Sequence, residues 1–223
     1  MATTGGSVFG ADLAKLPSGV SGIPRSLVLA SQRQRLIHGV TLAVAEQALN
    51  GTTIRDIAER AGVSKKTFYE HFPDKLACFL AAYDHGAAAL MGEVVEATVA
   101  ARRAGLGPTA QFRDGTRAYL SFLQREAPYS RTFCLEMLAA GPEATARHRA
   151  GRAAFADTVA VWHGLYAAGQ PAWPAVSAFS FEAATGLIYE IASGRIADGA
   201  SDQLLDIADD LAQAALAVLG IRA

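Results

Sequence analysis

The chain has 223 residues, of which 51% are hydrophobic and 18% charged, and its formal net charge is -1. This length and apolar content are enough for a buried core and exclude a disordered or collagen-like chain. The two cysteines, Cys78 and Cys134, lie far apart and form no C-x-x-C pair. That spacing excludes a disulfide scaffold or a zinc finger and fits a reducing compartment.

Positive charge gathers in the first third of the chain. Residues 1–75 hold nine Lys and Arg against six Asp and Glu, an excess of +3, so the remainder carries -4. Three of the four lysines fall between positions 65 and 75. Such a cluster suits a surface that meets phosphates, because neutralised phosphates release counterions. A solvated helix face is the alternative explanation.

The first 24 residues are rich in Gly, Ser and Thr and end at Pro24, which predicts a flexible arm. Their beginning has neither the basic nor the apolar region of a secretory signal, so we expect a cytoplasmic protein. Residues 158–181 contain no Asp, Glu, Lys or Arg and are long enough to span a bilayer. Because Gly and Pro interrupt this stretch, we expect the end of one helix, a turn and the start of another, with no membrane insertion.

Helical periodicity covers almost everything after the arm, and no run alternates apolar and polar residues for long enough to form a strand. The predicted fold class is therefore all-α. A first helix is expected over residues 33–50, a second from its cap Thr53 to Gly62, and a third over residues 65–72, capped by Ser64. A long helix follows Asp74. Further helices are expected over residues 108–125, 127–140, 142–168, 174–196 and 201–219.

Two short helices joined by a three-residue turn that contains Gly62 fit the description of a helix-turn-helix motif. In the second of them, Phe68 and Phe72 are spaced to face the core. The remaining side chains offer positive charges for phosphates, a hydroxyl donor, and a ring able to meet a thymine methyl group. The pattern therefore predicts a surface that reads double-stranded DNA.

The segment TTIRDIAERAGVSKKTFYEHFPDKLACF, residues 52–79, resembles the DNA-binding region of the TetR family of bacterial transcriptional regulators. The resemblance implies a homodimer whose two recognition helices enter successive major grooves of a pseudo-palindromic operator. It also implies a helical C-terminal domain that binds a small molecule and changes the spacing of those helices. We accordingly divide the chain into an arm (1–24), a DNA-binding domain (25–75), and a ligand-binding and dimerisation domain (76–223).

The resemblance also assigns contacts to single positions. Thr53 and Lys75 match phosphate contacts, and Arg55 matches a position that can reach a base, with a solvated arginine as the alternative. Arg25 is interpreted as a free tail arginine, with a minor-groove or phosphate contact as the alternative. On the recognition helix, three positions match major-groove contacts (Lys65, Lys66 and Tyr69) and two match backbone contacts (Thr67 and His71). The predicted DNA-binding set is Thr53, Arg55, Ser64, Lys65, Lys66, Thr67, Tyr69, His71 and Lys75.

The last two expected helices carry small and aliphatic residues along one side, which require a partner. Two helices from each subunit, paired as a four-helix bundle, would bury these sides under two-fold symmetry. Ordinary intrachain core is the alternative. The predicted dimer-interface residues are Phe181, Thr185, Ile188, Ala192, Leu204, Ala208, Leu211 and Ala215.

Aromatic and Met side chains in the middle helices can enclose an apolar cavity, with Arg117, Glu136 or His163 as polar handles. Each of these side chains, taken singly, is more often part of a core. The implied ligand is an unknown small and largely apolar effector. The candidate pocket residues are Tyr119, Phe122, Phe133, Met137, Trp162, His163 and Tyr166.

Enzyme activity is not expected, because the sequence contains no phosphate-binding glycine loop, H-E-x-x-H pair, G-x-S-x-G elbow or Glu-x-x-His pair. No cofactor and no metal are predicted. The leading hypothesis is a dimeric, ligand-responsive transcriptional regulator, expected to be a repressor. The alternative is a helical small-molecule carrier or sensor whose helix-turn-helix serves as a protein-interaction module.

Overall fold

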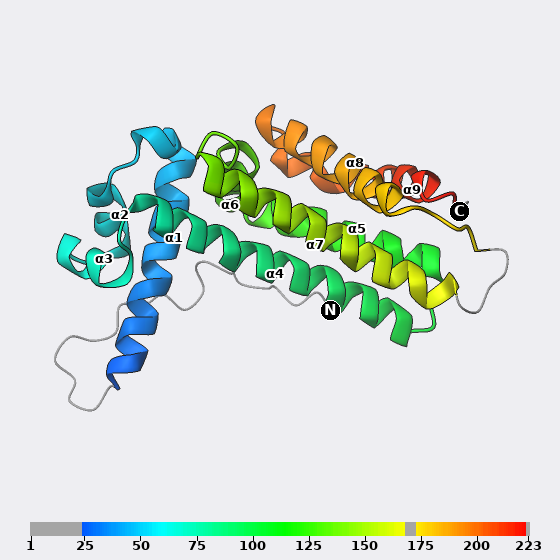
Figure 1. Ribbon diagram of the computed structural model, residues 1–223, viewed down its shortest axis with the longest axis horizontal. Helices are drawn as coiled ribbons and strands as arrows, with labels where there is room; N and C mark the ends of the chain where they lie inside the picture. The colour runs from blue at the N-terminus through cyan, green and yellow to red at the C-terminus, as the bar shows by residue number, and fades with distance from the viewer. Residues whose placement is uncertain (1–23, 168–172, 222–223) are drawn as a thin grey trace.

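The structure is a computed structural model that describes residues 24–167 and 173–221, and every regular element in these ranges is helical (Figure 1). The all-α prediction is therefore confirmed. None of the described helices is long and apolar enough to cross a membrane. The predicted arm, apart from Pro24, and part of the charge-free stretch lie outside the described residues. The helices are α1 (Arg25–Gly51), α2 (Ile54–Ala61), α3 (Lys65–His71), α4 (Lys75–Arg103), α5 (Pro108–Arg125), α6 (Ala127–Leu135), α7 (Pro142–Ala167), α8 (Ala178–Ala197), the 3-10 helix η1 (Ser201–Ile207) and α9 (Ala208–Val218).

The first helix is longer than its sequence pattern predicts, because it begins at Arg25 and not near residue 33. Pro24 occupies the N-cap position, and its carbonyl accepts hydrogen bonds from the backbone N–H groups of Leu27 (3.0 Å) and Val28 (3.3 Å). No Gly or Pro occurs between Arg25 and His38, so nothing in the sequence prevents the helix from beginning this early. Arg25 is thus the first residue of a helix, and the interpretation of it as a free tail arginine is wrong.

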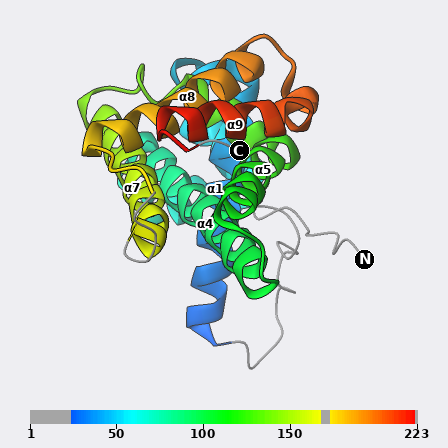
Figure 2. The ribbon, with the colours of Figure 1, turned by 90° about the vertical axis from the view of Figure 1, so that its right-hand side faces the viewer.

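The helices form a small head and a longer body. In Figure 1, α1, α2 and α3 gather at one end, and α4 runs from them along the body beside α5 and α7. In Figure 2, α8 and α9 lie together on one side of that body, where α8 packs against α7 and α9 against α5. Buried apolar side chains form one core that extends from Leu36 in the head to Leu219 after α9. The head is therefore fixed to the body through shared packing.

Two close approaches between helices depend on glycine. A Cβ atom on Gly39 of α1 would lie 2.8 Å from the carbonyl oxygen of Ile57 in α2. A Cβ atom on Gly86 of α4 would lie 1.9 Å from the ring of Tyr129 in α6. The first approach brings the backbones of α1 and α2 into direct contact, so Gly39 sets the position of α2 in the head.

Candidate DNA interface and effector cavity

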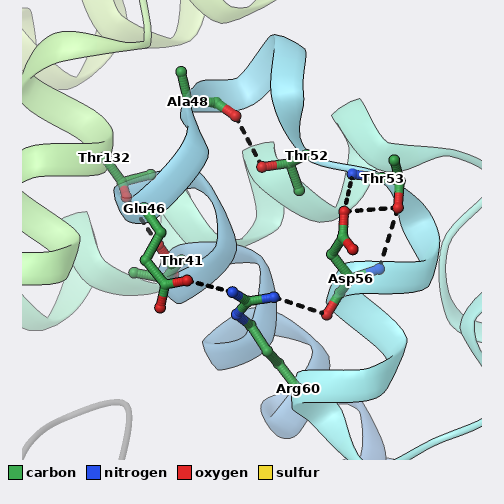
Figure 3. A network of polar contacts seen from close by, with 8 residues as sticks. All are labelled: Thr41, Glu46, Ala48, Thr52, Thr53, Asp56, Arg60 and Thr132. Atoms are coloured by element: carbon green, nitrogen blue, oxygen red, sulfur yellow. Dashed lines mark hydrogen bonds and ion pairs between the residues drawn. The ribbon is translucent and has the colours of Figure 1, made fainter.

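Reciprocal hydrogen bonds fix the start of α2. The Thr53 hydroxyl accepts a bond from the Asp56 N–H (3.2 Å), and the Asp56 carboxylate accepts one from the Thr53 N–H (2.8 Å), which is a capping box (Figure 3). Gly62 ends α2 in the left-handed region, with φ +61°. Arg35 of α1 donates to the carbonyl oxygen of Ala61 (2.7 Å), so α1 also supports the end of α2.

The following helix presents a short exposed surface. Ser64 caps it by accepting a hydrogen bond from the Thr67 N–H (3.0 Å), while Phe68 and Phe72 are buried in the core. A helix of two turns is not stable alone, so this packing holds it in place. Lys65, Lys66 and Tyr69 remain exposed, and we call these three residues the reading face. Tyr69 is 57% exposed, and its ring meets Phe68 edge-on, with 5.6 Å between the ring centroids.

Three other predicted contact residues already have partners within the head. The Thr67 hydroxyl lies 3.0 Å from that of Ser64, and His71 Nε2 lies 3.0 Å from the Gln32 side-chain oxygen. Burial, with a further contribution from Arg33, lowers the pKa of His71, so His71 offers DNA a hydrogen bond and no charge at neutral pH.

Arg55 pairs with Glu59 at 2.7 Å, and both side chains are well exposed. An exposed pair of this kind contributes little to stability, so Arg55 can exchange Glu59 for a phosphate or a base. Its predicted DNA contact stays a prediction.

Lys75 lies at the start of α4, as predicted, but its ammonium group points toward the segment that connects α1 and α2. It donates hydrogen bonds to the carbonyl oxygens of Leu49 (2.6 Å) and Thr52 (2.7 Å). Lys75 therefore holds the connection between α1 and α2, and its predicted phosphate contact must use its remaining N–H. No local pattern indicates this role, because the acceptors lie more than 20 residues away along the chain.

Just before this connection, a strained residue interrupts the end of α1: Ala48 has a φ of +58° and a ψ of 166°, which lie outside the regions favoured by residues with a side chain. The Thr52 hydroxyl donates to the Ala48 carbonyl oxygen (2.8 Å), and the Leu49 N–H donates to the Glu136 carboxylate (3.0 Å). Thr132 of α6 donates to the Thr41 carbonyl oxygen (2.9 Å) (Figure 3). Residues of the body that follow α5 thus bind α1 through hydrogen bonds. Glu136 is one of them, so it is not a polar group of the cavity described below.

Replacing Ala48 with glycine is expected to stabilise the protein by about 1 kcal/mol, because glycine adopts positive φ without a steric penalty. Thermal unfolding should show a melting temperature about 2–4 °C higher. Ala88, an exposed residue inside α4, provides the matched control, and Ala88→Gly should be destabilising by a similar amount. A decrease in stability for Ala48→Gly would contradict the strain at this position.

An apolar cavity of about 340 Å³ lies between α4, α5 and α7. This volume falls in the range of small-molecule sites in proteins. Exposed valines and a leucine stand at its edge, so apolar surface continues outward from the cavity. Its lining residues include Val94, Val99, Gly115, Phe155, Trp162 and Leu165.

The candidate pocket residues from the sequence are only partly brought together. Trp162 lines the apolar cavity, whereas Tyr119 and Phe133 line a second, smaller cavity. Phe122 and Met137 are buried in the core and line neither of these two cavities. His163 and Tyr166 pack against Trp173, and Arg117 forms an ion pair with Asp209 (2.9 Å). The valines, Gly115 and Phe155 were missed, because apolar residues at helical spacing can line a cavity or fill a core equally well.

Seven of the eight predicted dimer-interface residues are buried within the single chain, and the eighth, Phe181, is half-buried. The alternative of ordinary intrachain core applies to these positions. The opposite side of α8 and α9 is the exposed one. Its apolar and small residues, which we call the α8–α9 face, are Phe179, Ile191 and Gly194 on α8 and Ala214, Ala217 and Val218 on α9, with the half-buried Leu187 one turn before Ile191.

Comparison with known proteins relates both parts of the chain to bacterial regulators. Residues 43–82, from the middle of α1 into α4, match the family model described as bacterial regulatory proteins, tetR family. The HTH-type transcriptional regulator RutR of Escherichia coli (strain K12) is 28% identical over 121 residues, which are 53% of this chain and 53% of RutR. The match thus spans about half the length of the curated relatives.

Solved structures share the fold over most of the chain. The fatty acid degradation regulator FadR from Bacillus halodurans has a TM-score of 0.73 at 13% identity, covering 85% of this chain and 95% of that one. FadR from Bacillus subtilis, solved in complex with stearoyl-CoA, has a TM-score of 0.72 at 14% identity, covering 84% and 98%.

Proposed function

The chain belongs to the TetR family of bacterial regulatory proteins, a family of DNA-binding transcriptional regulators and not of enzymes, and from this premise we propose that it is a ligand-responsive repressor. It acts in the cytoplasm as a homodimer on a pseudo-palindromic operator. The observation that carries the proposal is the reading face, which consists of three exposed residues on α3. The Ser64 cap and the buried side chains of Phe68 and Phe72 hold this helix in place. Residues 25–75 then form the DNA-binding domain and residues 76–223 the ligand-binding and dimerisation domain.

The reading face has the chemistry that a major groove requires. Lys65 and Lys66 supply two positive charges for phosphates or guanine, and the Tyr69 ring supplies apolar contact for a thymine methyl group. The N–H groups of Thr53 and Asp56 already donate hydrogen bonds within the capping box. A phosphate at the start of α2 would therefore be bound by other groups of its first turn. The salt dependence of binding follows from these charges.

The α8–α9 face is the proposed contact between subunits, and it replaces the interface residues predicted from the sequence, most of which are buried within the single chain. It is apolar, it is exposed in the single chain, and it lies on two adjacent helices that can pair with their symmetry mates in a four-helix bundle. Ile191, which is 41% exposed, lies within it.

Replacing Ile191 with arginine is expected to convert the dimer to monomer, because two-fold symmetry places the new charge in the interface twice. Sedimentation velocity at several protein concentrations measures this change. Leu138→Arg is the control, since Leu138 is also exposed but lies after α6, away from that face. An unchanged oligomeric state for Ile191→Arg would exclude the α8–α9 face as the interface.

The apolar cavity is the proposed effector site. One continuous helix, α4, joins it to the head: Lys75 at its start holds the α1–α2 connection, and Val94 and Val99 further along line the cavity. An effector that prefers a displaced α4 therefore favours a head position that no longer fits the groove. The stearoyl-CoA complex of the B. subtilis FadR supports an apolar effector, because that protein holds a long acyl chain in the same fold.

The test is binding to DNA from the region upstream of the protein's own gene, measured by fluorescence anisotropy at low and moderate salt. The proposal expects saturable binding whose affinity falls steeply with salt concentration. A carrier whose helix-turn-helix contacts another protein predicts no such binding. That result would overturn the proposal in favour of the carrier.

A further inference from the structure

A second cavity of about 80 Å³ follows the apolar cavity along the same helices. It lies closer to the head, because α4 begins at the head and reaches the second cavity first. Leu90 of α4 lines the second cavity, and Val94, one turn further along, lines the apolar cavity. Phe155 of α7 lines both cavities, and its ring stacks on Tyr119 with 5.2 Å between centroids and 12° between planes. Phe155 thus stands between the two cavities, with the stacked Tyr119 on the side of the second one.

The second cavity contains donors without partners. Tyr119 is 5% exposed, and neither its hydroxyl nor that of Tyr83 makes a hydrogen bond to any residue that the structure describes. Neither oxygen is fully buried, so both hydroxyls can donate a hydrogen bond to an acceptor placed in the cavity. Gly151 makes room for one of them, because a Cβ atom there would lie 2.3 Å from the Tyr83 oxygen.

A cation without an acidic partner lies at the same place. The guanidinium group of Arg152 lies over the Tyr189 ring, 4.8 Å from its centroid, and forms no ion pair with a described carboxylate. Space for it comes from Gly186 of α8, where a Cβ atom would lie 2.9 Å from an Arg152 nitrogen. Arg152 and Thr185 also line an outer groove of about 280 Å³ on the surface, together with Arg149 and Glu182.

The other titratable groups around this cavity are neutral. Burial raises the pKa of Tyr83 to about 12 and that of Cys134 to about 12. Burial, together with Arg152, lowers the pKa of His148, so its imidazole is uncharged at neutral pH. Three carboxylates lie nearby: Asp84 is paired with Arg147, Glu190 lies near Tyr189, and Glu182 lines the outer groove together with Arg149. None of them forms an ion pair with Arg152 among the described residues.

We propose that the effector is an elongated amphipathic carboxylate, whose head is bound by Arg152 and the hydroxyls of Tyr83 and Tyr119 and whose apolar chain passes Phe155 into the larger cavity. The inference rests on the proposed function in placing the effector in that cavity. One cation and two hydroxyl donors match a monoanionic head. The small volume of the second cavity leaves the bulk of the molecule to the apolar one.

The experiment compares sodium decanoate with 1-decanol, a neutral molecule with the same chain, on the purified full-length protein without DNA. Binding is followed by tryptophan fluorescence, since Trp162 lines the apolar cavity. The wild type should bind decanoate more than about tenfold more tightly than decanol, which is typical of one charge-assisted contact. Arg152→Gln should abolish this preference by weakening decanoate alone, and Tyr119→Phe should reduce it by several-fold.

Arg149→Gln is the matched control, because Arg149 lines the outer groove and not the second cavity. It should keep the preference for decanoate. Equal binding of decanoate and decanol, no binding of either, or the same loss in both arginine variants would each overturn the proposal. DNA binding by the wild type is measured separately, so a protein that binds DNA but shows no carboxylate preference contradicts this inference and leaves the proposed function standing.

Discussion

Replacement of Lys65 and Tyr69 together by alanine is expected to weaken operator binding by about 100-fold, or about 3 kcal/mol. Lys65 supplies a charge and Tyr69 an apolar ring, and both are lost from the centre of the reading face. The slope of log affinity against log salt should become shallower by about one, because one positive charge is removed from the interface with DNA. Fluorescence anisotropy on the same DNA over a range of salt concentrations measures both quantities.

The double variant should remain folded, since both side chains are exposed and Phe68 and Phe72 hold the helix. Arg103→Ala/Leu106→Ala is the matched control, because it also removes one charge and one exposed apolar side chain, at the far end of α4. Its affinity for DNA should equal that of the wild type. If the two double variants bind equally well, the reading face has been assigned to the wrong residues.

Replacing Gly39 with alanine is expected to be destabilising by about 2–3 kcal/mol, a large effect for a single methyl group. The new Cβ atom would lie 2.8 Å from a backbone oxygen of α2, and also 3.3 Å from the backbone nitrogen of Ala61, so no flexible side chain can move aside. The two helices must separate, and α3 moves with α2. Chemical denaturation measures the free energy of unfolding, and DNA affinity should fall in the same variant.

Gly92 of α4 provides the control, because a Cβ atom there would meet no heavy atom within 4 Å. Gly92→Ala should stabilise the protein by about 0.5–1 kcal/mol through the better helix propensity of alanine. The two substitutions are chemically identical and both lie inside helices, so they differ only in the space around the new Cβ atom. Their effects on the free energy of unfolding should therefore have opposite signs. Destabilisation of equal size in both would show that α1 and α2 do not approach as closely as the structure indicates.

The sequence predicted the head well because its signals are local. Thr53, Ser64 and Asp74 cap the helices that they precede, and Phe68 and Phe72 are buried as their spacing predicts. Each of these assignments depends on residues within four positions of one another. Most helix boundaries in the body were also close, because Gly and Pro separate the periodic segments. The helix expected over residues 127–140 ends early, at Leu135, and the one expected over residues 201–219 begins as the 3-10 helix η1 before α9.

Contacts between distant segments were not predictable in the same way. Lys75 reaches carbonyl groups of the α1–α2 connection, and Glu136 accepts a hydrogen bond from Leu49, 87 positions earlier. The side of α8 that covers the core could not be chosen from the sequence, since Ile188 on one side and Ile191 on the other are equally apolar. Burial by the rest of the chain decides between them, and it leaves Ile191 exposed.

The most direct test of the central claim is a DNase I footprint of the protein on the DNA that it binds upstream of its own gene. Two reading faces presented by one symmetric dimer should protect two half-sites on the same side of the duplex, with centres about 10 base pairs apart or a multiple of this spacing. The half-sites should be related by a pseudo-two-fold axis. Protection of a single half-site, or of sites without this spacing and symmetry, would contradict the account.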